Sequence, residues 1–285
     1  MYYALIMFSV LLSCSRMVMG DVYRRMRGDS LLISLEYSWL GALAGTLFLF
    51  PMNSFRVEYT YFTLFASLAA AVLNLSFMFC TFRALGTINL SLYSVFAMLG
   101  SLLLPFVGGI LLFDEPLTLG KAICIVLIGA ALFFTVERSE KRKGSIFYIG
   151  IFLINGVYGL LNTYYAEATA PKASSTGYIL MVCIWMLVLV PVMLLFLRNK
   201  DYSRPSWGSL GLGLVSGSFA QLANLLVVIA LAHVDASVQY PMVTGGIMIV
   251  STLYCYFTPQ KPSKKEILSV ATAFLGLLAM FLIPI

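Results

Sequence analysis

Charged residues are scarce in this chain. Only 11% of its 285 residues are Asp, Glu, Lys or Arg, whereas 61% are hydrophobic. A soluble domain typically carries about 25% charged residues to solvate its surface. The composition therefore excludes an ordinary water-soluble protein and indicates a surface that faces lipid. At ~20 residues per span, the length allows at most about twelve transmembrane helices.

Groups that perform catalysis or bind metals are also few. The chain has one histidine, and its five cysteines stand singly in apolar runs, without Cys-x-x-Cys or Cys/His spacing. No Gly-x-x-x-x-Gly-Lys phosphate loop is present, which disfavours a nucleotide-driven pump. An intramembrane enzyme would need a nucleophile and base or a metal cluster, so it is the least favoured class. We expect no cofactor and no metal. The net charge of +6 does not indicate nucleic acid, because the basic residues lie in short loops.

Long apolar runs fill most of the sequence. Charges and turn residues divide them into ten segments that are long enough to cross a membrane. We therefore predict an all-α integral membrane protein with about ten transmembrane helices, near residues 2–19, 31–50, 61–82, 88–112, 118–136, 145–166, 175–197, 207–231, 236–258 and 266–283.

The two halves of the chain resemble each other. A shift of 146 residues aligns the spans and loops without a gap. It superposes Trp39 on Trp185, Ala84-Leu85 on Ala230-Leu231, Ser91 on Ser237, and Pro116 on Pro262. Each half, 1–140 and 141–285, then holds five spans. Because five is odd, the second half enters the membrane from the opposite side, as in the inverted repeats of many secondary transporters.

The loop charges support inverted halves independently. Where one half has a basic loop, the matching loop of the other half is poor in positive charge. The contrast is seen after the first and sixth spans and after the second and seventh: Arg24, Arg25 and Arg27 against Lys172, and Arg56 against Arg198, Lys200 and Arg204. Fourteen of the 18 Lys and Arg residues fall on one side and three on the other. The positive-inside rule then predicts that both termini face outside.

A short segment after the fourth span adds a family resemblance. The run Phe113-Asp114-Glu115-Pro116-Leu117-Thr118 is followed by Gly120 and by Leu127-Ile128-Gly129. Together with about ten spans in a five-plus-five repeat, it resembles the drug/metabolite transporter superfamily, EamA type. The resemblance covers the whole chain. It implies a central cavity, alternating access, and transport of small metabolites or drugs.

Two charged residues lie at membrane depth. Glu36 is in the second span and Arg16 is in the first, each near the predicted cytoplasmic end. A charge at the centre of a span costs about 2.5–3.5 kcal/mol on insertion scales, so each needs a partner or a cavity. We predict that the two lie close together as a coupling pair. A purely structural ion pair, or an arginine that snorkels to the interface, is the alternative.

Polar residues mark one face of the sixth span. Asn155, Tyr158, Asn162 and Tyr165 recur at helical spacing, and the matching first span carries Ser9, Ser13 and Arg16. Polar residues in spans face the bundle interior, so we predict that this face lines a substrate cavity. Interhelical hydrogen bonding is the alternative. Weaker substrate-site candidates are Asn74, Gln221, Asn224, Trp39 and Trp185.

The leading functional hypothesis is a secondary transporter in the plasma membrane. It would move a small polar or amphipathic metabolite, such as an amino acid, by alternating access, with Glu36 as a candidate for proton coupling. The alternative within transport is an exporter of organic cations or drugs that uses Glu36 as counter-charge. A non-transport intramembrane enzyme is the remaining alternative. The expected partners are a small solute, the lipid bilayer and protons, and the protein is a monomer or a homodimer.

Overall fold

The computed structural model describes residues 2–112, 118–139, 145–197, 204–231, 236–258 and 261–283. The segment Phe113–Leu117, which carries much of the family resemblance, lies outside the described residues. So do parts of the basic loops, at 140–144 and 198–203. The described residues form ten α-helices: α1 (Tyr2–Arg27), α2 (Leu31–Met52), α3 (Tyr61–Leu85), α4 (Leu90–Leu112), α5 (Leu119–Ser139), α6 (Ser145–Glu167), α7 (Ser175–Phe196), α8 (Trp207–Leu231), α9 (Ala236–Tyr256) and α10 (Lys264–Leu282).

The predicted spans agree with these helices within a few residues, except at the end of α1. Within the described residues, six helices are long and apolar enough to cross a membrane by length and composition: α1, α2, α3, α6, α7 and α8. The large apolar side chains of Phe65, Leu195 and Tyr61 remain exposed, as a lipid-facing surface requires. The described part of the chain is thus all-helical and has the properties of a membrane protein.

Side-chain caps define where several helices begin. Ser30, Thr60, Ser174 and Ser263 each accept a hydrogen bond from the backbone N–H three residues ahead, which satisfies one of the free donors of the first turn. Glu266 completes a capping box with Ser263 at α10. The long polar end of α1 is held by Asp21, which pairs with Arg24 at 2.9 Å and Arg25 at 2.7 Å one turn further along.

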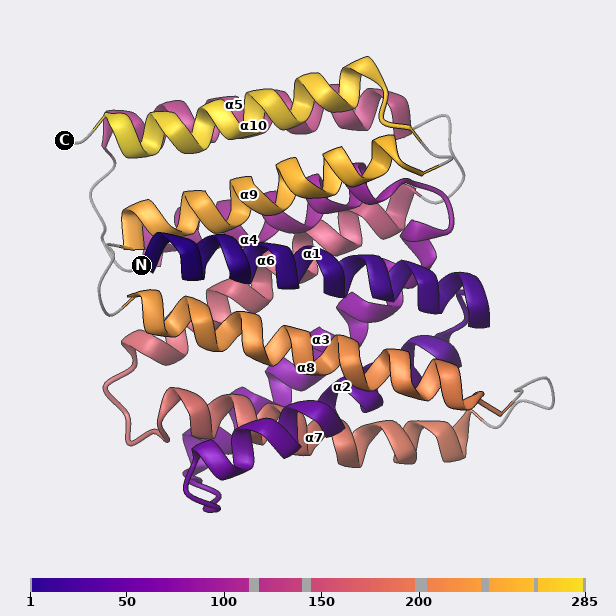
Figure 1. Cartoon of the computed structure of the whole chain (residues 1–285). Coiled ribbons are helices and arrows are strands. Elements are labelled where there is room, and N and C mark those ends of the chain that lie inside the picture. The colour runs from indigo at the N-terminus through magenta and orange to yellow at the C-terminus, as the bar shows by residue number, and fades with distance from the viewer. Residues whose placement is uncertain are drawn as a thin grey trace.

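The helices form two layers of five (Figure 1). One layer runs in the order α10, α9, α1, α8, α2, and the other runs α5, α4, α6, α3, α7. The layers touch through α5 with α10 and α4 with α9 on one side, and through α2 with α7 on the other. Each layer therefore mixes helices from both halves of the chain. α1 begins and α10 ends on the same side of the bundle (Figure 1).

Glycines allow the closest helix crossings. A Cβ on Gly100 of α4 would lie 2.3 Å from the Phe152 carbonyl oxygen of α6, and one on Gly156 of α6 would lie 2.8 Å from the Gly100 oxygen. Likewise, a Cβ on Gly217 of α8 would lie 2.8 Å from Gly41 Cα of α2. Small residues let helix backbones meet in this way, and in lipid such packing is a main source of helix association.

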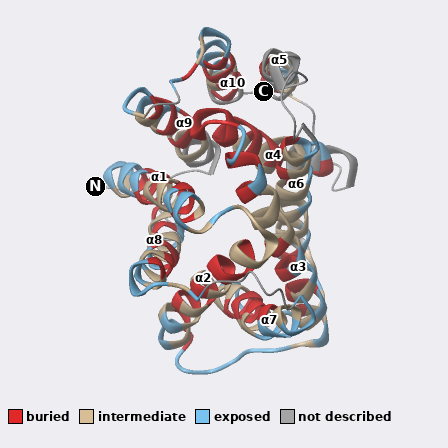
Figure 2. Cartoon of the chain, turned by 90° about the vertical axis from the view of Figure 1, so that its right-hand side faces the viewer, coloured by how far each residue is buried: buried red, intermediate tan, exposed pale blue. Residues whose placement is uncertain are grey.

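Buried residues lie mainly where the helices face one another, and exposed ones lie on the outside and at the ends (Figure 2). The aromatic residues Tyr93, Phe96 and Tyr148 centre one apolar cluster, built from α1, α3, α4, α6 and α9. A second cluster joins α2, α3, α6 and α7 around Leu180 and Val190. These two clusters flank the middle of the bundle, where the site described next is found.

Candidate functional site

A polar cavity lies in the middle of the bundle, where α1 and α8 of one layer face α3 and α6 of the other. It consists of two adjoining lobes with volumes of about 150 Å³ and about 220 Å³. The lobes share six wall residues, so we treat them as one and call it the central cavity. The shared residues are Arg16, Asn74, Met78, Tyr158, Ala220 and Asn224.

The wall residues come from near the middle of their helices. Arg16, Asn74 and Tyr158 each lie within about one turn of the centre of α1, α3 and α6 respectively. Gln221 occupies a similar level on α8. The cavity is therefore far from both ends of the bundle, at the depth where water is least available to polar groups.

Arg16 supplies the charge of the central cavity. Among the described residues that line either lobe, it is the only charged side chain. It forms no ion pair with a described acidic residue. It also lines a small third pocket beside Tyr37 and Tyr93. A guanidinium offers five N–H donors and stays charged, so the centre of the bundle is electropositive.

Amides and hydroxyls supply the remaining polarity. Asn74, Gln221 and Asn224 bring three side-chain amides to the wall, and Tyr158 and Tyr37 bring two hydroxyls. Tyr37 of α2 is hydrogen-bonded to Ser216 of α8, across the crossing of these helices. Each amide can both donate and accept hydrogen bonds. The wall can therefore bind polar groups of either kind around the one positive charge.

Part of the wall of the central cavity is apolar. Met78, Ile179, Val182, Cys183 and Met186 line it, and four of them come from α7. Methionine is flexible and polarizable, so such a wall adapts to apolar bodies of different shape. The combination of one charge, several polar groups and an apolar wall is characteristic of a small-molecule site.

Seven residues that the sequence suggested for a site meet on these walls. They are Ser13, Arg16, Asn74, Asn155, Tyr158, Gln221 and Asn224. Asn155 has a structural contact as well, because its side-chain amide donates to the Ala97 carbonyl of α4 at 2.6 Å. A role of these residues in substrate binding stays a prediction.

The outer half of the α6 polar face does not reach the central cavity. Asn162 accepts a hydrogen bond from the Tyr178 hydroxyl at 3.0 Å. Tyr165 is buried, hydrogen-bonded to Thr63 and to the Ala173 carbonyl, and its ring stacks on Tyr178 with centroids 4.1 Å apart. Neither residue is among those that line the two lobes, so the expectation that all four residues of this face line one cavity stays a prediction for these two. They join α6 to Tyr178, near the start of α7.

Ser9 and the two tryptophans are also absent from the cavity walls. Ser9 is fully buried and donates to the Ile6 carbonyl of its own helix. Trp39 packs between two apolar clusters and donates to the Leu187 carbonyl at 3.4 Å. Trp185 packs in the cluster of α2, α3, α6 and α7. Their surroundings indicate packing between helices rather than contact with a solute.

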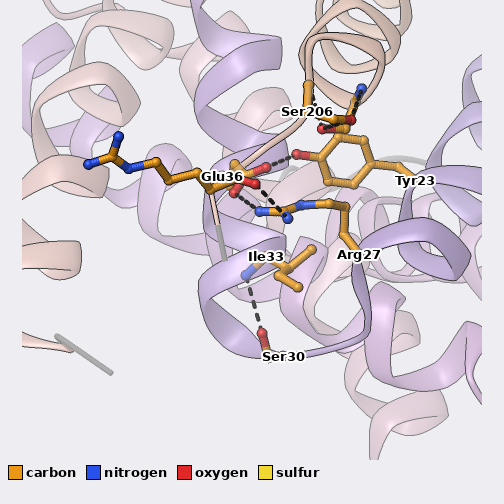
Figure 3. A network of polar contacts seen from close by, with 8 residues as sticks. Tyr23, Arg27, Ser30, Ile33, Glu36 and Ser206 are labelled. Atoms are coloured by element: carbon orange, nitrogen blue, oxygen red, sulfur yellow. Dashed lines mark hydrogen bonds and ion pairs between the residues drawn. The ribbon is translucent and has the colours of Figure 1, made fainter. Parts of the chain in front are cut away.

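Glu36 pairs with Arg27, not with Arg16. Its carboxylate contacts Arg27 at 2.9 Å and accepts a hydrogen bond from the Tyr23 hydroxyl (Figure 3). The predicted pair with Arg16 is wrong because α1 continues for two turns beyond its apolar run. Tyr23 and Arg27 thereby reach the first turns of α2, whereas Arg16 lies about 16 Å back along the helix axis.

The Glu36 network lies at one end of the bundle. Arg27 also donates to the Arg204 carbonyl at 3.3 Å, just before α8. Glu36 and Arg27 are almost fully buried, with side-chain exposures of 7% and 9%. The network therefore joins α1, α2 and the start of α8 over the central cavity. We call Tyr23, Arg27 and Glu36 the inner cluster.

A second polar cluster lies at the opposite end. The backbone N–H of Ser174, before α7, donates to the Glu58 carboxylate at 2.7 Å, between α2 and α3. This hydrogen bond lowers the pKa of the exposed Glu58 carboxyl below its ordinary value. Nearby, the backbone N–H of Ala173 donates to the Thr63 hydroxyl at 3.0 Å. We call Glu58, Thr63, Ala173 and Ser174 the outer cluster.

Several wall residues carried no signal in the sequence. Tyr37, Ser38 and Ser216 line the central cavity, yet isolated Ser and Tyr are common in membrane helices. Tyr37 directly follows Glu36, and only the neighbours of α2 in three dimensions show that the two side chains point to different partners. The close approach of Gly217 to Gly41 brings α2 and α8 together beside these residues.

Comparisons with known proteins give the fold but no family. No protein-family model matches the chain, and no curated protein matches it. A solved structure described only as "Crystal structure of protein" is similar with a TM-score of 0.61, over 99% of this chain and 96% of that chain. The sequence identity is 13%, so the likeness shows the overall fold alone.

Proposed function

We propose that this protein is a secondary transporter that moves a small polar or amphipathic metabolite across a cell's plasma membrane by alternating access. The observation that carries the proposal is the central cavity, which holds polar groups and one charge at the middle of apolar helices. Ionisable residues at that depth are costly and mark solute or ion pathways. The described residues that line this cavity include no nucleophile paired with a general base, which favours transport over catalysis.

An inverted repeat underlies the proposed mechanism. The packing of the helices supports it, because contacts recur when each helix is exchanged for its counterpart five places along. α1 contacts α8 and α9, and correspondingly α6 contacts α3 and α4. The close approach of Gly156 to Gly100 is matched by that of Val10 to Gly246, a shift of 146 residues for both partners.

The position of the cavity supports the same symmetry. Three pairs of wall residues are related by the 146-residue shift: Tyr37 with Cys183, Asn74 with Ala220, and Met78 with Asn224. A site on the axis that relates two inverted halves can open to either side by the same rearrangement. The proposal therefore retains the drug/metabolite transporter superfamily as the family that the sequence resembles.

The ends of the bundle support a membrane orientation. The inner cluster lies at the end that carries Arg24, Arg25, Arg83, Lys264 and Lys265, whereas the end with the outer cluster carries Arg56 and Lys172. Positive charge marks the cytoplasmic face. We therefore place the inner cluster in the cytoplasm and both termini outside.

The alternative of an organic-cation exporter is less well supported, because Glu36 does not line the central cavity. That hypothesis needed Glu36 as a counter-charge, but Glu36 belongs to the inner cluster. No acidic residue is found among the described residues that line the central cavity. Proton coupling through Glu36 would act on the closure of this end rather than on the bound solute.

Purified protein tests the proposal in two steps. First, a thermal-unfolding screen with amino acids, organic acids, amines and sugars should reveal a solute that raises the unfolding midpoint, because binding to the folded state alone stabilises it. Second, proteoliposomes should take up that solute. Tyr158→Phe should weaken the effect, whereas Tyr164→Phe, on the exposed side of α6, should not. Binding without uptake would refute transport.

A further inference from the structure

The charge on the cavity wall indicates the chemical class of the substrate. We infer, building on the proposed transport function, that the substrate is a small amphipathic monocarboxylate and that Arg16 is its counter-charge. The inference rests on three observations about the described wall: one cation that pairs with no described acid, no acid opposite it, and an apolar surface beside it.

The first step concerns Arg16 itself. The other described arginines of the α1–α2 end have carboxylate partners: Arg24 and Arg25 bind Asp21, and Arg27 binds Glu36. Arg16 differs because it faces the central cavity and pairs with no described acid. A guanidinium at membrane depth without a counter-ion is costly. The structure thus places a guanidinium beside a space that is large enough for a small anion.

The second step concerns the amount of charge. A single guanidinium balances one negative charge, and bidentate pairing matches the planar fork of a carboxylate. A phosphate monoester carries a charge of about −1.5 to −2 near neutral pH and would remain partly uncompensated. A zwitterion or an amine would bring an ammonium group to a wall without a described carboxylate to receive it. Of these classes, the monocarboxylate is the one that makes the occupied cavity neutral.

The third step concerns the rest of the molecule. Asn74 and Gln221 add side-chain amide groups. Each amide can donate a hydrogen bond to a keto oxygen, and can donate to or accept from a hydroxyl. On the α7 side, Ile179, Val182 and Met186 offer an apolar wall. Lobes of about 150 Å³ and about 220 Å³ accommodate a compact body rather than a nucleotide or a lipid. The preferred substrate is therefore a short organic acid with an apolar or hydroxylated body.

Matched ligands separate charge from shape. Phenylacetate, phenylacetamide, 2-phenylethylamine, phenylalanine and phenyl phosphate share a phenyl body but differ in charge. A second series would use lactate and butyrate, each with its amide and amine. Thermal unfolding of the purified protein at millimolar ligand is the readout. A monocarboxylate should raise the midpoint, and its amide, its amine and phenyl phosphate should raise it less.

Variants at Arg16 test the counter-charge. Arg16→Gln should weaken monocarboxylate binding about 10- to 100-fold, the loss expected when a charged hydrogen bond is removed. Arg16→Lys, which retains the charge but not the fork, should lose less. Arg56→Gln is the matched control, because Arg56 is exposed in the loop after α2. If Arg16→Gln fails to fold, the binding of a monocarboxylate and of its amide to Arg16→Lys still tests whether Arg16 is the counter-charge.

The outcomes separate this inference from the proposed function. Equal or stronger binding of amines, amides, zwitterions or phosphates would overturn it, and so would failure of every monocarboxylate in both series. Unchanged monocarboxylate binding by Arg16→Gln would overturn it as well. If monocarboxylates bind through Arg16 but do not enter proteoliposomes, the inference stands and transport falls. If amines are transported, transport stands and the inference falls.

Discussion

Glu36 of α2 and Arg27 of α1 form a buried ion pair with their side-chain nitrogen and oxygen atoms 2.9 Å apart. Tyr23 binds the same carboxylate, and Arg27 reaches the backbone before α8. One acidic residue thus ties together three segments at one end of the central cavity. This arrangement gives Glu36 a structural role, and its control of access to the cavity stays a prediction.

Removing the charge of Glu36 should destabilise the protein. Glu36→Gln leaves the buried Arg27 guanidinium without this carboxylate, and breaking a buried pair from one side costs about 3–5 kcal/mol. The thermal midpoint of the purified variant should fall. The double variant Glu36→Gln/Arg27→Gln should regain part of the loss, since neither charge is then left alone. A double variant that loses the sum of both single effects would show that the two residues are not coupled.

The same substitution should open the cytoplasmic end. Cys183 lines the central cavity and can report on access, once the other four cysteines are replaced. Maleimide should label Cys183 faster in Glu36→Gln than in the parent, because the inner cluster no longer bridges α1 and α2. Asp29→Asn is the control, since Asp29 is a half-exposed carboxylate at the same end that pairs with Arg83 at 3.5 Å. Equal labelling rates in all three proteins would exclude a gate at Glu36.

Arg16 should make transport depend on exchange. An empty cavity that closes must bury an uncompensated guanidinium, which costs several kcal/mol, whereas a monocarboxylate neutralises it. Proteoliposomes loaded with the unlabelled acid should therefore take up the labelled acid at least about tenfold faster than empty ones, the change that about 1.4 kcal/mol in the barrier produces. Equal rates in loaded and empty vesicles would mean that the empty carrier returns freely.

The crossing of α4 and α6 should not tolerate a side chain. Gly100→Ala places a Cβ 2.3 Å from the Phe152 carbonyl oxygen, so the helices must separate at a cost of about 1–3 kcal/mol. Gly211→Ala in α8 is the matched control, because a Cβ added at Gly211 would have nothing within 4 Å of it. There alanine should be neutral or stabilising, as it is the better helix former. Thermal unfolding of the two variants gives the comparison, and an unaffected Gly100→Ala protein would contradict the close crossing.

The outer cluster should weaken in acid. The pKa of Glu58 is lowered in the folded protein by the hydrogen bond from Ser174, so the unfolded state binds its proton first as the pH falls. The stabilisation is present above the ordinary pKa of 4.5 and is lost as the pH drops through the lower folded value. Glu58→Gln should remove this dependence. The test compares unfolding midpoints of parent and variant through the acid range; parallel curves would assign the acid effect to other groups.

The helices could be predicted from the sequence because lipid imposes a simple rule. A span must be apolar for about 20 residues, and charges or turn residues must end it. Hydropathy marks the edge of the membrane rather than the end of the helix. For this reason the first span predicted from the sequence ends about two turns before α1 does. There Asp21 pairs with the arginines one turn ahead, and the helix continues as far as Arg27.

The site could be predicted only in part. Helical spacing placed Asn155 and Tyr158 on one face and implied that Arg16 and Asn74 point inward. It could not say how far along that face the cavity extends, because Asn162 and Tyr165 contact Tyr178 at the start of α7. Helical spacing also could not predict which charged residues form ion pairs, because the partner of Glu36 depends on where α1 ends. Such choices depend on helix crossings that no local pattern in the sequence records.

The packing of α1 against α8 has a consequence for biogenesis. The ribosome must complete six further helices, α2 to α7, before α8 is available to cover α1. During that interval Arg16 has no finished cavity to face, and its long side chain must reach toward the lipid headgroups. A chain that stalls before α8 therefore leaves Arg16 without the helix that packs against α1 in the folded protein.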